Sequence, residues 1–239
     1  MTCQPGDAGR VVLRLRTMSN AANVRGMMRF GISPHNTLGV SVPDLRMIAK
    51  ETGTNHGLAL ELWRTGIHEA RNLAGLIDDP SAVTETQMER WAGDFDSWDI
   101  CDGVCSNLFD KTPFAAAKAR AWSRRKEEYV KRAGFVLMAA LAVHDKEAAD
   151  KLFESFLPII KRESIDDRNF VRKAVNWALR QIGKRNVNLN RVAIRTAKEI
   201  QRIDSRAAKW VAADALRELE GPAVARKLGR KMAQKSLSR

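Results

Sequence analysis

The stretch Leu179-Arg180-Gln181-Ile182-Gly183 closes a helical run of small apolar residues with a leucine and then a polar break. The same arrangement recurs along the chain, with the leucines spaced 32, 33, 38 and 37 residues apart. The recurring leucines are Leu76, Leu108, Leu141, Leu179 and Leu216. This period is typical of repeats that each consist of two helices. It predicts stacked helix pairs, and an irregular helical bundle is the alternative.

Composition and local signals agree with a helical chain. Alanine, leucine, arginine and lysine are abundant, and alternating runs of β-branched residues are nearly absent. Helix-start patterns occur at Ser41-Val42-Pro43, Thr84-Glu85-Thr86-Gln87 and Thr112-Pro113. We therefore predict an all-α, HEAT-like helical-repeat solenoid. We expect one domain at 17–233, a loose N-terminal arm at 1–16 and a basic tail at 234–239.

Charge is divided unevenly between the two halves of the chain. Residues 1–119 hold 12 basic and 14 acidic side chains, whereas residues 120–239 hold 29 basic and 14 acidic ones. A solvated surface would explain scattered lysines, but so large an excess in one half favours a polyanionic partner. Because stacked helix pairs curve, we expect a concave basic groove on the inner face of the solenoid.

Several classes of protein and site are disfavoured. The three cysteines are too few for a disulfide framework, and the first residues lack the apolar core of a secretory signal. No segment has the roughly 18 uninterrupted apolar residues of a membrane-spanning helix. The histidines are scattered and no phosphate-binding glycine-rich loop is present, so we expect no metal and no cofactor. These features predict a cytoplasmic protein with no membrane association and no obligate protein partner.

Two tryptophans stand in patterns that suit a cationic ligand. Trp98 and Asp102 are four residues apart, which places an aromatic plane and a carboxylate on one face of a helix. Trp177 shares a helical stripe with basic residues, while apolar residues fill most of the opposite side. The basic members of that stripe are Lys173, Arg180 and Lys184. Asp102 could instead cap a helix or pair with an arginine, and tryptophans at helical spacing are often core residues. Trp63, Trp91, Trp122 and Trp210 are expected by default to pack in the interior, with Trp210 as the exception to watch because Arg206 and Arg217 share its stripe.

Four segments occur in an order that resembles a known family. They are Gly39 to Arg46, Trp98 to Asp102, Lys131-Arg132-Ala133, and Arg172 to Arg180. Over roughly residues 20–230 the chain resembles the AlkD-like DNA alkylation repair glycosylases. The resemblance implies a HEAT-like α-solenoid that hydrolyses the N-glycosidic bond of cationic N3- or N7-alkylated purines in duplex DNA.

The resemblance also assigns roles to residues of this chain. Asp102 would be the catalytic carboxylate, because a carboxylate facing C1′ stabilises the positive charge that develops on the sugar. Trp98 and Trp177 would place indole faces against the cationic base. Arg132 would hold the DNA backbone beside the lesion, although Arg124 and Arg125 lie close enough in sequence to replace it.

Further basic residues are candidates for general contacts with DNA phosphates. They are Lys131, Arg172, Lys173, Arg180 and Lys184. No lysine is marked as a Schiff-base nucleophile, so the resemblance implies a monofunctional DNA glycosylase acting on double-stranded DNA with alkylated bases. The alternative function is a non-catalytic helical-repeat protein that binds nucleic acid through the same groove.

Overall fold

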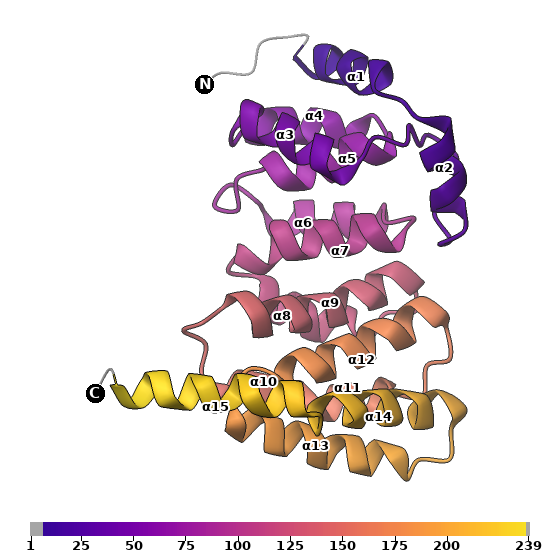
Figure 1. Ribbon diagram of the computed structural model, residues 1–239. Helices are drawn as coiled ribbons and strands as arrows, with labels where there is room; N and C mark the ends of the chain where they lie inside the picture. Colours follow the sequence, from indigo (N-terminus) through magenta and orange to yellow (C-terminus); the bar gives the residue numbers. More distant parts are fainter. Residues whose placement is uncertain (1–6, 238–239) are drawn as a thin grey trace. The chain divides into compact units, whose positions relative to one another are not determined.

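The computed structural model describes residues 7–237, with side chains described up to residue 230. Every regular element within these residues is a helix, and none is a strand (Figure 1). The all-α prediction is therefore confirmed. The chain separates between Phe114 and Ala115 into two compact units. The single domain that the sequence predicts at 17–233 stays a prediction.

The elements follow one another in chain order. The first unit contains α1 (Asp7–Thr17), α2 (Ala21–Met28), α3 (Val42–Thr52), α4 (His56–Arg64), α5 (His68–Ile77), α6 (Glu85–Gly93), α7 (Trp98–Asn107) and the 3-10 helix η1 (Phe109–Lys111). The second contains α8 (Ala115–Trp122), α9 (Glu128–His144), α10 (Asp150–Glu154), α11 (Leu157–Glu163), α12 (Asn169–Gly183), α13 (Val187–Gln201), α14 (Arg206–Leu219) and α15 (Pro222–Leu237).

The recurring leucines mark the ends of successive helices. Four of them lie in the last turns of α5, α9, α12 and α14, and Leu108 directly follows α7. The helices α5, α7, α9 and α12 are each preceded by a shorter helix or by a pair of shorter helices. The sequence period therefore corresponds to a repeated helical unit. In the region that the structure describes, no helix is long and apolar enough to cross a membrane.

Both ends of the described chain are more regular than expected. Residues 7–16, which we expected in a loose arm, form most of α1, and Leu15 of that helix is fully buried. Residues 234–237, expected in a basic tail, continue α15. Residues 1–6 and 238–239 lie outside the described part of the chain. A buried leucine anchors α1 because leaving it in water would cost about 1.5 to 3 kcal/mol.

Two of the three helix-start signals act as predicted. The Thr84 hydroxyl accepts a hydrogen bond from the Gln87 backbone N–H at 3.1 Å, and the Ser41 hydroxyl accepts one from that of Asp44 at 3.3 Å. At the third, α8 begins only at Ala115. The reason is that Thr112 ends η1 instead, with its backbone N–H and hydroxyl both donating to the Phe109 carbonyl.

Stacked aromatic rings form the centre of the first unit. The rings of Trp63 and Trp91 lie parallel with their centroids 3.9 Å apart, and Phe95 and Phe109 pack around them. The Trp63 indole N–H donates to Asp94 at 2.8 Å, so its polar edge is satisfied. Both tryptophans are buried, which confirms the packing role predicted for them.

Helix α9 is the core of the second unit. All its residues from Arg132 to Ala142 are buried, and it packs against α8 and α12. At Gly134 the backbones of α8 and α9 approach so closely that an added Cβ would lie 2.5 Å from the Ser123 backbone nitrogen. Trp122 at the end of α8 is buried, as predicted.

Candidate functional site

The beginning of α7 is fixed by a network of buried polar groups. Ser97, which immediately precedes the helix, donates its hydroxyl hydrogen to the Asp99 carboxylate at 2.7 Å. The other Asp99 oxygen lies 2.8 Å from Nε2 of His68 at the start of α5. His68 is 6% exposed. The network therefore joins the N-terminal ends of α5 and α7.

Asp99 and His68 shift each other's pKa in opposite directions. Burial acts to lower the pKa of His68, but the hydrogen bond and negative charge of Asp99 outweigh it, so the pKa is raised. Burial likewise acts to raise the pKa of Asp99, but the hydrogen bond from His68 prevails and lowers it. The two shifts favour an imidazolium–carboxylate pair. Asp99 is therefore held in a structural ion pair with His68.

Trp98 lies on the wall of a cavity in the first unit. Its indole N–H donates to the Phe30 carbonyl at 3.0 Å, and the side chain is half-buried. The cavity has a volume of about 440 Å³. Its lining comes from α2, the segment between α2 and α3, the start of α3, polar residues of α5 and the first turn of α7. The hydrogen bond to Phe30 holds the indole orientation without covering the whole ring.

Asp102 follows Trp98 by one turn and lies on the same side of α7. Ile100, Cys101 and Val104 of that helix face the core, whereas Trp98 and Asp102 are both partly exposed. The structure therefore brings these two predicted residues together. Burial is the largest of the effects that raise the pKa of the Cys105 thiol, and the negative charge of Asp102 is among the smaller ones.

Trp177 and Arg132, the other two predicted catalytic residues, belong to the second unit. Trp177 is half-buried on α12, with exposed Lys173 one turn before it. Arg132 on α9 is only 6% exposed, and its guanidinium donates to the Phe170 carbonyl at 2.5 Å. In the structure Arg132 therefore holds the beginning of α12, and its contact with DNA stays a prediction.

Lys131 is also engaged within the protein. Its ammonium lies 2.6 Å from the Glu163 carboxylate and 2.9 Å from that of Asp166, and its side chain is 12% exposed. Burial acts to raise the pKa of Asp166, but hydrogen bonds from Arg168 and Lys131 lower it to about 2. The sequence analysis did not predict these partners, and the phosphate contact of Lys131 stays a prediction.

Helix α12 is joined to α14 by a series of three contacts at regular spacing. In each contact the α14 residue lies 38 positions further along the chain. The pairs are Arg172 with the ring of Trp210 at 4.7 Å, the Asn176 amide with Asp214 at 2.7 Å, and Arg180 with Glu218 at 2.7 Å. The residues are four apart on both helices, so the contacts follow matching faces of two neighbouring repeats.

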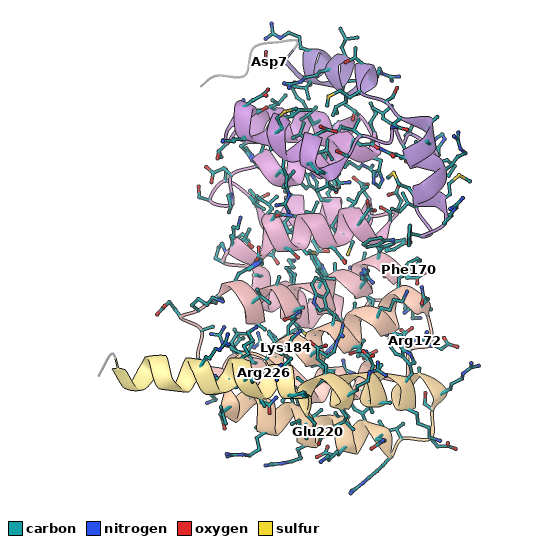
Figure 2. The ribbon with its side chains drawn as sticks, viewed as in Figure 1. Asp7, Phe170, Arg172, Lys184, Glu220 and Arg226 are labelled. Atoms are coloured by element: carbon teal, nitrogen blue, oxygen red, sulfur yellow. The ribbon has the colours of Figure 1, made fainter. Side chains whose placement is uncertain are left out.

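The acidic partners in these contacts, Asp214 and Glu218, were not predicted from the sequence. Glu218 also accepts a hydrogen bond from Lys184 at 2.6 Å. Burial acts to raise the pKa of Glu218, but Lys184 and Arg180 lower it, so the carboxylate is charged at neutral pH. Figure 2 labels Arg172 and Lys184, which lie toward opposite ends of α12. The signal that could have revealed Asp214 and Glu218 is the repeat period itself, since an offset of 38 is close to the leucine spacing of 37.

Trp210 differs from the other three tryptophans that were expected to pack. It is 38% exposed, and one face of its ring is covered by the Arg172 guanidinium. The α12 and α14 surface therefore presents two indoles, Trp177 and Trp210, among five cations and two carboxylates. The charged residues are Arg172, Lys173, Arg180, Lys184, Arg217, Asp214 and Glu218.

No curated protein matches the chain significantly. One solved structure, at 22% identity and a TM-score of 0.74, covers 89% of this chain and 96% of its own. It is described as belonging to "a new family of proteins related to the HEAT-like repeat DNA glycosylases with affinity for branched DNA structures". This likeness confirms the predicted HEAT-like fold. The family model for the DNA alkylation repair enzyme matches residues 11–219. The chain therefore belongs to the DNA alkylation repair enzyme family.

Proposed function

We propose that this protein is a monofunctional DNA glycosylase that removes cationic N3- or N7-alkylated purines from duplex DNA, as a step of base excision repair in the cytoplasm. The observation that carries the proposal is the pair formed by Trp98 and Asp102, one turn apart on the partly exposed side of α7. The Ser97, Asp99 and His68 network supports this pair by fixing the first turn of that helix.

The proposed reaction needs one carboxylate and no general acid. As the glycosidic bond breaks, its electrons move to the base, which carried a positive charge and leaves neutral. Positive charge develops on the sugar, where the Asp102 carboxylate stabilises it. A water molecule then adds to C1′ and loses a proton. The indole face of Trp98, in the same unit as Asp102, attracts the cationic base by about 0.5 to 2 kcal/mol. For Trp177 the same kind of attraction to a cation stays a prediction.

The DNA backbone would be held by residues of the second unit. Lys173 is exposed, while Arg172, Arg180 and Lys184 lie beside it on α12. Phosphate contacts of this kind position a duplex without reading its sequence. Arg132 would then act by fixing the start of α12 through its contact with Phe170, in addition to any contact with phosphate.

The test is release of methylated purines from alkylated duplex DNA under single-turnover conditions. Asp102→Asn keeps the shape of the side chain and removes its charge, so we expect at least about a hundredfold loss of rate. The matched control is Asp96→Asn, because Asp96 is an exposed carboxylate that precedes α7. We expect this control to retain wild-type rate. Unimpaired base release by Asp102→Asn would refute the catalytic role.

A second function, binding of branched DNA without catalysis, is favoured by the description of the similar structure. It predicts tight binding to a four-way DNA junction and no release of any base. The same assay separates the two functions, because only the glycosylase yields free methylpurine.

A further inference from the structure

Helix α13 carries a row of exposed cations that the proposed active site does not use. Its members are Arg191, Arg195, Lys198 and Arg202, here called the α13 stripe. They recur at steps of four, three and four residues, so they lie on one side of the helix. The stripe lines a shallow hollow of about 400 Å³, together with Ile194 and Glu199.

The stripe faces away from the rest of the second unit. The opposite side of α13 is buried, and Ala193 on that side lies against Gly183 of α12, where an added Cβ would be 3.1 Å away. Since the stripe residues lie about 140° to 200° around the helix from Ala193, they point away from α12. Figure 2 shows nitrogen-tipped side chains extending from α13 on the side away from α12 and α14.

Within the described part of the chain, three of the four stripe cations form no ion pair, although the charges of Arg195 and Arg202 help to lower the pKa of Glu199 after Lys161, which has the largest effect. Lys198 pairs with Glu220 at 2.9 Å, and Glu199 is taken by Lys161 at 2.7 Å. Among the residues that the structure describes, no carboxylate lies within ion-pair distance of Arg191, Arg195 or Arg202. On α12, by contrast, Arg180 and Lys184 are both bound to Glu218.

We infer that the α13 stripe binds the phosphate backbone of a second segment of duplex DNA. The stripe spans twelve residues from Arg191 to Arg202, or about 16 Å, which corresponds to about five phosphates of one strand. A duplex lying against α12 cannot also reach the opposite side of the unit, so the stripe requires another arm of DNA. This inference rests on the DNA-binding part of the proposed function.

The composition of the stripe favours a nucleic acid over a lipid surface. A helix that lies in a membrane interface needs large apolar side chains next to its cations. Between the arginines, the only large apolar side chains of α13 that are even partly exposed are Val192 and Ile194, while Glu199 and Gln201 are polar and exposed. Arginine also forms bidentate hydrogen bonds with phosphate, which suits a backbone contact.

The experiment compares two triple variants of the full chain on a four-way DNA junction and on a short linear duplex. The first, Arg191→Ala/Arg195→Ala/Arg202→Ala, removes the unpaired cations of the stripe. The control, Lys50→Ala/Arg64→Ala/Arg90→Ala, removes the same charge from exposed positions of the first unit. We expect the stripe variant to bind the junction at least about tenfold more weakly, with a salt slope flatter by about 2.7. The control should bind the junction like the wild type.

Two further readouts make the outcome decisive. Single-turnover release of methylpurine from a saturated linear duplex should be unchanged in the stripe variant, so failure of the glycosylase proposal would show separately as absence of release in the wild type. Unchanged junction affinity and slope would overturn the inference, and so would an equal loss in the control. Binding of the wild type to phosphatidylserine vesicles that the stripe variant loses, with junction binding intact, would assign the stripe to a membrane instead.

Discussion

Replacing Lys131 separates a role within the protein from a role in binding DNA. Lys131→Met keeps most of the aliphatic stem and removes the charge that lies between Glu163 and Asp166. Arg168 and Lys131 together lower the pKa of Asp166 from 3.8 to about 2 against the effect of burial. A shift of this size corresponds to about 2.4 kcal/mol, of which we assign roughly 1 kcal/mol to Lys131 because Arg168 shares the effect.

Glu163 adds a second contribution of the same sign. Burial acts to raise its pKa, but hydrogen bonds from Lys131 and Arg162 lower it. The side chains of Lys131, Glu163 and Asp166 are 9 to 15% exposed, so the loss should lie between that of a surface pair and that of a fully buried one. We expect a total destabilisation of about 2 kcal/mol, which lowers the melting temperature by about 4 to 8 °C.

The pH dependence gives this prediction a specific signature. Because the folded-state pKa values of both carboxyls are lowered, their stabilisation is present above the unfolded values and is lost as the pH falls toward about 2. The melting temperatures of Lys131→Met and the wild type should therefore converge below about pH 3. The assay is thermal unfolding at several pH values, with Lys173→Met as the exposed control on α12, which should stay within about 0.5 kcal/mol of the wild type. Equal melting temperatures at pH 7, with weakened DNA binding, would refute the internal role of Lys131.

Two other perturbations test the packing and the polar network. Gly134→Ala places a Cβ against the Ser123 backbone nitrogen and should cost about 1 to 3 kcal/mol in thermal unfolding, whereas Gly9→Ala, with nothing within 4 Å, should be neutral or slightly stabilising. A Gly134→Ala protein as stable as the wild type would contradict the close approach of α8 and α9. His68→Gln removes the charged partner of Asp99. The raised pKa of His68 gives stability that is complete below 6.5 and is lost as the pH rises through the folded value, and the lowered pKa of Asp99 gives stability present above 3.8. The difference in melting temperature between wild type and His68→Gln should therefore be largest near about pH 5 to 6 and shrink in alkaline solution, and a difference that grows with pH would contradict the pair.

The sequence predicted the helices better than it predicted their contacts. Periodic leucines and capping residues act within one helix or one turn, so their spacing reveals helix ends such as those of α5 and α12. The placement of Trp98 and Asp102 on one side of a helix could be predicted for the same reason, since both lie on α7. Contacts with residues of distant segments could not be predicted in this way. The ion pairs of Lys131 and the burial of Arg132 depend on how α9 packs against α11 and α12, and no local pattern in the chain encodes that packing.

The N-terminal segment illustrates the same limit. Residues 7–16 carry several arginines and follow a polar start, which suggested a loose arm. The structure anchors them through Leu15, a single buried contact that composition does not reveal. The repeat period continues across residue 114, so the spacing of the leucines gives no sign of the two compact units, and the single domain at 17–233 stays a prediction.

Under the proposed function, the carboxylate of Glu218 affects how long the protein would stay bound to undamaged DNA. A phosphate that approaches Arg180 or Lys184 has to exchange with Glu218, which already binds both cations. The exchange replaces one anion by another, so each encounter gains less free energy than a contact with an unoccupied cation. Short residence times allow a protein to slide and hop over many base pairs. Under the proposed function, Glu218 would therefore favour a rapid search along DNA over tight binding.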